Sequence, residues 1–261
     1  MKNYKGAAFF DVDGTLFSHT QHAVPASTAH ALEQLGKKEI LRVVATGRHL
    51  RELPQLPVRS DCFDAFLTLN GQLCLDAQGN ILFSNPITGD SRDALLRLFR
   101  EKTVPVMLVE KDRMYLNFAD PRVEAAQTAV SSSVAETGSY TGNALYQAVA
   151  YLDRTQEDAL SKFLPGCKIT RWNDCAVDII AASDGKADGI REYLRVSSIA
   201  PEETMAFGDG DNDLEMLRLV GLGVAMGNGE EALKQKADLI APTNEEGGVA
   251  DMLELAIKGE I

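Results

Sequence analysis

Short apolar runs alternate with amphipathic stretches along the first third of the chain. This pattern is typical of a parallel sheet covered by helices, because strands buried on both faces read as apolar runs and helices show one apolar face. A helix is expected from a cap at Ser27 to Gly36, with Leu32 and Leu35 on its buried face. Turn residues at 76–80 predict a hairpin. The strands expected in this part of the chain cover residues 7–10, 40–45, 65–69, 72–75 and 81–84.

The alternation of strands and helices changes near Pro86. A helix starting at Asp90 or Ser91 is followed by apolar runs that read as paired strands, and the simple repeat of strand and helix is lost. This stretch is therefore interpreted as an inserted α+β module. The elements expected within it are strands at 106–110, 114–118 and 145–152, a short helix at 158–163, and strands near Ile169 and Val177.

The alternation returns at Lys186. A helix with three large apolar residues on one face begins there, and strands are expected at 205–207 and 222–226, separated by a helix from Asp213. The first and last parts of the chain together predict an α/β fold with a doubly wound, Rossmann-like parallel sheet. The domains expected are a catalytic core of residues 1–85 and 182–261 and an inserted α+β cap domain of residues 86–181.

Four of the apolar runs end directly at polar residues. In an open parallel sheet the carboxyl ends of the strands meet at one edge, where ligands bind, so these polar residues are expected to surround one crevice. Any one of them taken alone could simply cap the turn or helix that follows. The polar residues at the ends of the runs are Asp11, Thr46, Asn70, and Asp209 with the preceding Gly208.

Acidic residues are concentrated at two of these strand ends. Asp11 and Asp13 flank one residue and precede Gly14, and the segment Asp209-Gly210-Asp211-Asn212-Asp213 adds three carboxylates. Like charges this close repel each other unless a cation binds, and hard oxygen ligands suit Mg²⁺. A solvated acidic turn is the alternative, but it does not explain why both clusters directly follow buried apolar runs.

Three other ligand-binding motifs are excluded by their spacing. A calcium-binding loop in the second acidic segment would place Leu214 where glycine is required. A phosphate-binding P-loop ending at Lys186 would need Ser or Thr where Ala187 stands, and a dinucleotide fingerprint at Gly221 would need glycine where Met226 stands. Neither an EF-hand nor an NAD site is therefore expected.

The formal net charge of −12 argues against binding to nucleic acid or to an anionic membrane surface. A small anionic substrate would need a metal ion or a few basic side chains to bind. No apolar run approaches the roughly 20 residues that span a bilayer, and the N-terminal residues show no secretory signal, so the cytoplasm is the expected location. The four cysteines show neither metal-site spacing nor a disulfide framework and are interpreted as reduced packing residues.

Four ordered segments of the chain resemble the motifs of the haloacid dehalogenase (HAD) superfamily. Their joint presence is highly specific. The pair Asn70-Gly71, the run from Gly208 to Leu217 and the large insertion before Lys186 resemble in addition the Cof-type (subfamily IIB) branch of sugar and small-metabolite phosphatases. The four segments are Asp11-Val12-Asp13-Gly14-Thr15-Leu16, Thr46-Gly47-Arg48, Lys186 and Gly208-Asp209-Gly210-Asp211-Asn212-Asp213.

The resemblance implies a Mg²⁺-dependent phosphatase that acts through an aspartyl-phosphate. Asp11 would attack phosphorus, and Asp13 would protonate the leaving alcohol and then deprotonate water. Lys186 alone would be read as a solvated lysine at a helix start, but its place in the ordered set favours a charge at the phosphate site. Asp213 would orient Lys186 or a metal-bound water. The implied Mg²⁺ ligands are Asp11, Asp13 and Asp209, and the implied phosphate-binding residues are Val12, Thr46, Gly47, Lys186 and Asn212.

Two other functions stay open at the level of sequence. A phosphomutase or phosphotransferase would pass the phosphoryl group from Asp11 to a sugar hydroxyl instead of water. A ligand sensor would bind a phosphometabolite without turnover, although binding alone does not require a proton donor beside the nucleophile. The expected partner is a small phosphorylated metabolite; its identity and the oligomeric state stay open.

The inserted domain is expected to close over the site and to select the leaving group. Arg171 and Trp172 are candidates to line a substrate pocket, although Trp172 is equally well explained by packing. Arg48 is expected either to contact substrate or to form a surface ion pair.

Overall fold

The chain forms two compact units. The core unit comprises Met1–Phe83 and Asp184–Ile261, and the inserted unit comprises Ser84–Ser183. The structure is a computed structural model that describes residues 5–18, 20–55, 60–130, 132–182 and 185–261.

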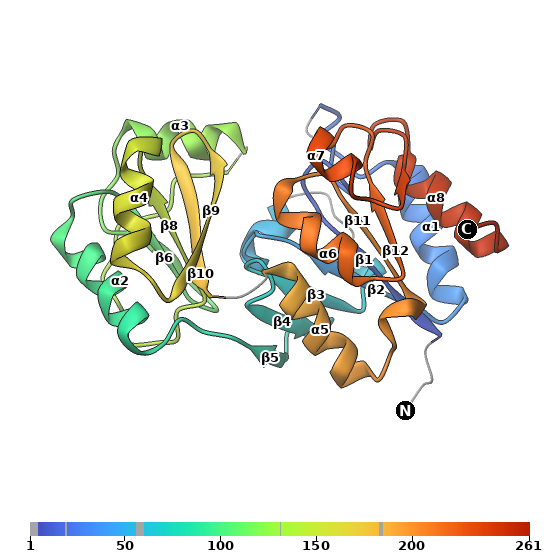
Figure 1. The fold of residues 1–261 in the computed structure, drawn as a ribbon, viewed down its shortest axis with the longest axis horizontal. Coiled ribbons are helices and arrows are strands. Elements are labelled where there is room, and N and C mark those ends of the chain that lie inside the picture. Colours follow the sequence, from blue (N-terminus) through green and yellow to red (C-terminus); the bar gives the residue numbers. More distant parts are fainter. Residues whose placement is uncertain (1–4, 19, 56–59, 131, 183–184) are drawn as a thin grey trace. The chain divides into compact units, whose positions relative to one another are not determined.

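A mostly parallel sheet forms the centre of the core unit (Figure 1). β1 (Gly6–Phe10) lies in its middle and pairs in parallel with β2 (Ile40–Ala45) on one side and β11 (Thr204–Gly208) on the other. The chain extends the sheet first on one side of β1 and later on the other, so the strand order reverses beside β1. The other strands are β3 (Ala65–Thr68), β4 (Leu73–Asp76), β5 (Ile81–Ser84), β12 (Leu222–Ala225) and β13 (Leu239–Ile240), in the order β13-β12-β11-β1-β2-β3-β4-β5.

Helices cover both faces of this sheet. α1 (Ala26–Lys37) and α8 (Gly248–Lys258) pack together on one face, and α5 (Lys186–Ser197) and α6 (Leu214–Leu219) pack on the other (Figure 1). Among the described helices, none combines the length and apolar character needed to cross a membrane. The remaining helical segments are α7 (Glu231–Lys234) and the 3-10 turns Leu50–Gln55, Ser60–Cys62, Pro201–Glu203 and Asp211–Asp213.

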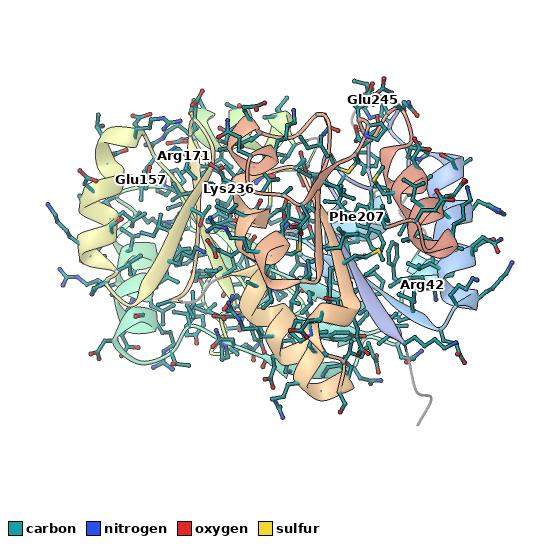
Figure 2. The ribbon with its side chains drawn as sticks, turned by 45° about the vertical axis from the view of Figure 1, so that its right-hand side comes forward. Arg42, Glu157, Arg171, Phe207, Lys236 and Glu245 are labelled. Atoms are coloured by element: carbon teal, nitrogen blue, oxygen red, sulfur yellow. The ribbon has the colours of Figure 1, made fainter. Side chains whose placement is uncertain are left out.

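Alternating residues of β1 enter the two cores on either side of the sheet. Ala8 and Phe10 pack on the side of α1 and α8, whereas Ala7 and Phe9 pack on the side of α5 and α6. The Phe10 ring stacks on that of Phe207, which is labelled in Figure 2, with ring centroids 5.1 Å apart. Each of these fully buried aromatic side chains contributes on the order of 2 kcal/mol through apolar burial, so the strand that carries Asp11 is firmly anchored.

The inserted unit is built on an antiparallel sheet. Its helices α2 (Gly89–Glu101) and α4 (Arg154–Phe163) contribute Leu95 and Leu160 to a single apolar core with the sheet. A third helix, α3 (Pro121–Ala129), contacts β10. The strands are β6 (Val106–Val109), β7 (Met114–Leu116), β8 (Gln147–Tyr151), β9 (Cys167–Asn173) and β10 (Ala176–Ala181), in the order β7-β6-β8-β10-β9.

The predicted fold class is confirmed. The core has a doubly wound sheet with helices on both faces, and the middle block forms a separate α+β sheet. The hairpin predicted around the turn at 76–80 is also present: the Asp76 carboxylate accepts hydrogen bonds from the amides of Gln78 and Asn80, which fixes the turn between β4 and β5.

Several predicted boundaries are wrong, among them the helix expected at 158–163, which begins at Arg154, and the strand expected at 114–118, which ends at Leu116. Pro25, not Ser27, is the residue before the first turn of α1, and no side chain caps that helix. The strand expected to reach residue 69 ends at Thr68, because Leu69 adopts a left-handed backbone conformation with φ 55°. The helix expected from Asp90 or Ser91 starts at Gly89, after extended backbone at Thr88.

Candidate active site

The polar residues after β1, β2, β3 and β11 lie at one edge of the core sheet. The strands are parallel and paired in register, with Phe10 opposite Phe207, so Asp11 and Asp209 follow neighbouring strand ends. The Asp11 amide donates to the Phe207 carbonyl at 3.0 Å. The Asn70 amide donates to the Thr46 carbonyl, also at 3.0 Å. The structure therefore brings together the strand-end residues singled out from the sequence.

Three aspartates form a cluster that could hold a cation. One carboxylate oxygen from each of Asp11, Asp209 and Asp213 lies within 4.8 Å of the others. The sequence-based set of metal ligands named Asp13 and not Asp213. In the structure Asp213 lies beside the other two acids, whereas the Asp13 carboxylate is paired with Arg48.

Lys186 is buried inside this acidic cluster. Its side chain is 1% exposed, and its Nζ donates to Asp11 Oδ1 at 2.5 Å and to Asp213 Oδ1 at 2.6 Å. Burial alone would lower the pKa of Lys186, but the two carboxylates outweigh it and raise that pKa above its usual range. Lys186 therefore carries a fixed positive charge next to the Asp11 carboxylate, and a solvated role is excluded.

The remaining negative charge makes the cluster a favourable place for a cation. Burial, with repulsion from neighbouring aspartates, raises the pKa of Asp11 well above its usual value even though Lys186 opposes the shift. Burial and the charge of Asp213 raise the pKa of Asp209 to about 7. A divalent cation would favour the ionised form of both carboxyl groups.

Hydrogen bonds engage some of the carboxylate oxygens of these three aspartates. Asp213 uses Oδ1 for Lys186 and Oδ2 for the backbone amides of Asp209 and Gly210, at 3.0 and 3.1 Å. Asp209 accepts from the Thr15 hydroxyl only through Oδ1. Within the described part of the chain, Oδ2 of Asp11 and Oδ2 of Asp209 accept no such bond. Hard carboxylate oxygens suit a divalent cation, and Asp213 in addition fixes the backbone of Asp209 and Gly210 through its hydrogen bonds.

Asp13 forms a two-point ion pair with Arg48. Arg48 donates from Nε to Asp13 Oδ2 at 2.6 Å and from Nη2 to Oδ1 at 2.9 Å. Burial would lower the pKa of Arg48, but the hydrogen bonds and charge of Asp13 raise it. Of the two expectations for Arg48, the structure shows an ion pair, with the acid two residues after Asp11 as partner; a contact of Arg48 with substrate stays a prediction.

The residues expected to bind phosphate lie around the same strand ends. The Thr46 hydroxyl accepts the Arg48 amide at 3.1 Å, and Asn212 Nδ2 donates to Asn70 Oδ1 at 3.4 Å. The Val12 side chain is fully buried in the core, so only its backbone can reach a ligand. Gly47 lies against the Asn70 side chain, where a Cβ atom would come within 3.1 Å of Oδ1.

Gly14 allows the loop after β1 to approach Asp209. Its φ is +79°, and a Cβ atom at this position would lie 2.1 Å from Asp209 Oδ2. Any side chain would therefore displace the carboxylate. The Gly14 carbonyl accepts a hydrogen bond from Asn228 Nδ2 at 2.8 Å, which fixes the loop from the opposite side.

Sequence reasoning missed two contacts of this site. Thr15 donates to Asp209 at 3.1 Å, and Asn228 holds the Gly14 carbonyl. Thr15 lies within the first motif, so its position gave a signal that was not used. Asn228 follows β12 and has no local feature that distinguishes it from an asparagine in a turn.

Arg171 in the inserted unit is occupied by contacts within that unit. Its Nε donates to Glu157 Oε2 at 2.8 Å, as Figure 2 lets the reader follow, and its Nη1 donates to the carbonyls of Asn173 and Asp174 at 2.9 Å. These bonds tie β9 to α4. Trp172 is 36% exposed, which is more than a packing anchor between sheet and helix requires.

Comparison with known proteins assigns the chain to a family. Residues 8–253 match the family described as haloacid dehalogenase-like hydrolase. The chain is 30% identical over 248 residues to the putative phosphatase YkrA of Bacillus subtilis (strain 168), covering 93% of this chain and 94% of that protein. The chain therefore belongs to the haloacid dehalogenase-like hydrolase family.

Solved structures of this superfamily share the fold. The phosphatase BT1666 of Bacteroides thetaiotaomicron superimposes with a TM-score of 0.86 at 29% identity, covering 98% of this chain and 96% of that one. The HAD subclass IIB sugar phosphatase BT4131 superimposes with a TM-score of 0.82 at 30% identity, covering 96% and 99%. The predicted family, its subclass IIB resemblance and the predicted class of enzyme, a HAD-type phosphatase, agree with these relatives.

Proposed function

We propose that this chain is a Mg²⁺-dependent phosphatase that hydrolyses small phosphate monoesters, such as sugar phosphates, through an aspartyl-phosphate on Asp11. The observation that carries the proposal is the position of Asp11, whose Oδ1 is held at 2.5 Å by the buried Lys186. This bond engages Oδ1 of the carboxylate. The names of the similar proteins, a putative phosphatase and a sugar phosphatase, support the choice of substrate class.

The first step is attack on phosphorus by one carboxylate oxygen of Asp11. A bond forms between this oxygen and phosphorus and the ester P–O bond breaks. Asp13, protonated and released from its ion pair with Arg48 for this step, gives its proton to the departing alkoxide. In the second step Asp13 takes a proton from water, the water oxygen bonds to phosphorus, and the Asp11 carboxylate leaves. Inorganic phosphate is released and both aspartates return to their starting state.

The phosphoryl group needs positive charge and hydrogen-bond donors around it. Lys186 supplies the fixed charge, and the Thr46 hydroxyl, the Gly47 amide and the Asn212 side chain supply donors at the neighbouring strand ends. The Val12 side chain is buried, so its part is limited to the backbone amide. These groups stabilise the charge that spreads over the phosphoryl oxygens in the transition state.

Mg²⁺ would be held by Asp11 and Asp209, and the carbonyl oxygen of Asp13 is proposed as a further ligand. When bound, the ion neutralises charge on the phosphoryl oxygens and lets an anionic nucleophile approach an anionic ester. The carboxylates of Asp11 and Asp209 support the fit, because their oxygens lie close together and the pKa of each is raised by burial and by repulsion from neighbouring aspartates.

The proposal is tested by phosphate release from a panel of monoesters. Wild-type protein is assayed with Mg²⁺ and with EDTA, and Asp11→Asn is assayed with Mg²⁺. We expect turnover only for the wild-type protein with metal. Activity that survives EDTA, or activity retained by Asp11→Asn, contradicts the mechanism. Transfer of phosphate between sugar positions without release would identify a phosphomutase instead.

A further inference from the structure

Three consecutive residues after β3 adopt left-handed backbone conformations. The φ values are 55° at Leu69, 53° at Asn70 and 83° at Gly71. Glycine and asparagine tolerate this region, but a buried leucine does so only when the surrounding structure enforces it. Leu69 is 1% exposed. The turn 69–71 is therefore a constrained feature of the core unit.

Backbone hydrogen bonds fasten this turn to the loop after β2. The Leu69 amide donates to the Arg48 carbonyl at 3.2 Å, and the Asn70 amide donates to the Thr46 carbonyl at 3.0 Å. On the other side, Gln72 Nε2 donates to the Asn70 carbonyl at 3.2 Å. The backbone amide and the backbone carbonyl of Asn70 are thus both hydrogen-bonded, which holds the backbone of the turn in place.

The same turn packs against the first residues of α5. A Cβ atom on Gly71 would lie 2.7 Å from the Gly185 carbonyl oxygen and 3.2 Å from the Cα atom of Lys186. A Cβ atom on Gly189 would meet the Gly71 backbone at 2.8 Å. The two glycines allow the helix to approach closely, which places Lys186 at Asp11.

The Asn70 side chain lies between two of the proposed phosphate-binding groups. Its Oδ1 accepts a hydrogen bond from Asn212 Nδ2 at 3.4 Å, and a Cβ atom on Gly47 would lie 3.1 Å from Oδ1 and 3.2 Å from Nδ2. Asn70 is 7% exposed. An asparagine is well suited to this position, because it tolerates the left-handed backbone and presents an acceptor and two donors.

We propose that Asn70 is a positioning residue of the phosphate site. Its side chain orients the side-chain amide of Asn212 and borders Gly47, and the constrained turn 69–71 holds Asn70 at this position. The inference rests on the proposed phosphatase function. In this proposal the Asn70 side chain orients Asn212, whereas the Asn70 backbone holds the turn. Substitutions can separate these two roles.

Asn70→Gly separates the side chain from the backbone. Glycine adopts φ 53° without steric cost, so this variant removes the amide and keeps the turn, whereas Asn70→Ala removes the amide and strains the turn. We expect both variants to lose about 10- to 100-fold in kcat/KM, the usual effect of removing a group that orients a ligand-binding residue. Asn70→Gly should melt close to the wild-type temperature, and Asn70→Ala should melt lower.

Ser198→Gly is the matched control. Ser198 also has a left-handed conformation, with φ 58°, but it is an exposed residue at the end of α5. This substitution relieves the same backbone cost away from the site and should leave kcat/KM unchanged. An equal loss of activity in Ser198→Gly and Asn70→Gly would overturn the proposal. It would mean that a more flexible backbone, and not the missing Asn70 side chain, lowers kcat/KM.

A double-mutant cycle supplies a readout that a purely structural role does not move. Since Asn70 acts through Asn212, the double variant Asn70→Gly with Asn212→Ala should be no worse than Asn212→Ala alone. Fully multiplicative losses, or wild-type kcat/KM in Asn70→Gly, overturn the proposal.

Binding of inorganic phosphate keeps the test independent of turnover. With Mg²⁺ present, the phosphate-induced rise in melting temperature should be smaller in Asn70→Gly than in the wild-type protein, and unchanged in Ser198→Gly. A wild-type protein that binds phosphate without hydrolysing esters would contradict the proposed function and leave this measurement of Asn70 intact. An equal rise in Asn70→Gly and wild type overturns the role of Asn70.

Discussion

Arg48 holds both carboxylate oxygens of Asp13, with donor–acceptor distances of 2.6 and 2.9 Å. This relationship joins the loops after β1 and β2 and fixes the direction of the side chain proposed as the proton donor. A flexible acid would sample many orientations, and catalysis by proton transfer depends on the productive one. Arg48 is therefore important for esters whose leaving group needs a proton.

Substituting Arg48→Met should slow the hydrolysis of alkyl phosphates by about tenfold or more, within the range that proton donation contributes. Hydrolysis of p-nitrophenyl phosphate should change much less, because nitrophenolate leaves without protonation. The measurement is kcat/KM for both esters. Arg42→Met is the matched control, since Arg42 forms a similar two-point pair with Asp64 in the same unit, at 3.0 and 3.2 Å. Equal losses for the two esters would argue against this role of Arg48.

Removing the charge of Lys186 should affect both stability and catalysis. Lys186→Met leaves two buried carboxylates without their positively charged partner. Breaking a buried ion pair in this way lowers the free energy of unfolding by about 3–5 kcal/mol, and a loss of this size is expected here. Activity should fall by at least about 100-fold, as expected for losing a group that stabilises the transition state. Urea unfolding in EDTA measures the first effect and phosphate release with Mg²⁺ measures the second. Unchanged stability in EDTA would contradict the buried ion pairs.

Binding of Mg²⁺ should weaken at acidic pH. The pKa of Asp209 lies at about 7 without metal, so below that pH a proton competes with the ion for the carboxylate. The apparent dissociation constant for Mg²⁺ should rise as the pH falls below 7, by about tenfold per pH unit for each ligand carboxyl group that takes up a proton. Magnesium titrations at several pH values check this. The titrations span about pH 5.5 to 8, a range that includes the Asp209 pKa of about 7. A Mg²⁺ affinity that stays constant over this range would contradict the prediction.

The same shift predicts how the metal-free protein responds to pH. The pKa of Asp209 is higher in the folded protein than in the unfolded chain, so the folded state binds the proton more tightly. This contribution to stability is present at acidic pH and is lost as pH rises from about 4 to about 7. In EDTA the protein should therefore lose stability over this range, and Mg²⁺ should restore it. Asp209→Asn, which cannot titrate, should show a smaller loss.

A pair of glycine substitutions tests the close approach of Gly14 to Asp209. Gly14 and Gly79 have nearly the same backbone, with φ +79° and +82°, but nothing lies within 4 Å of a Cβ atom at Gly79. Both Gly→Ala substitutions impose a left-handed alanine at about 1 kcal/mol. Only Gly14→Ala should also abolish phosphate release, because its methyl group displaces the carboxylate. Normal activity in Gly14→Ala would contradict the geometry.

The strand ends of the site could be predicted because the signal lies in adjacent residues. An apolar run that leads directly into Asp11 or Thr46 marks both a buried strand and its polar end, and parallel pairing brings these ends together. The family motifs added Lys186, whose burial no local pattern indicates. It depends on the close packing of Gly71 and Gly189, which lie far apart in the chain.

Other features depended on contacts that a linear pattern does not contain. Arg48 and Asp13 are 35 residues apart, and several acids in the sequence were equally available as partners. The helix α3 was not predicted because it buries only two apolar residues, Val123 and Ala126, so its amphipathic pattern is weak. The Asp120 cap followed by Pro121 is a start signal that was not used. The left-handed conformation of Leu69 was not predictable, because leucine rarely adopts it.

The central claim is that Asp11 carries the phosphoryl group during turnover. The most direct measurement is a rapid acid quench of the wild-type protein turning over a good substrate with Mg²⁺, followed by mass spectrometry of its peptides. We predict a phosphorylated peptide whose modification lies on Asp11 and is released by hydroxylamine, as expected of an acyl phosphate, and none in Asp11→Asn. Phosphate on another residue, or steady turnover by Asp11→Asn, would contradict the account.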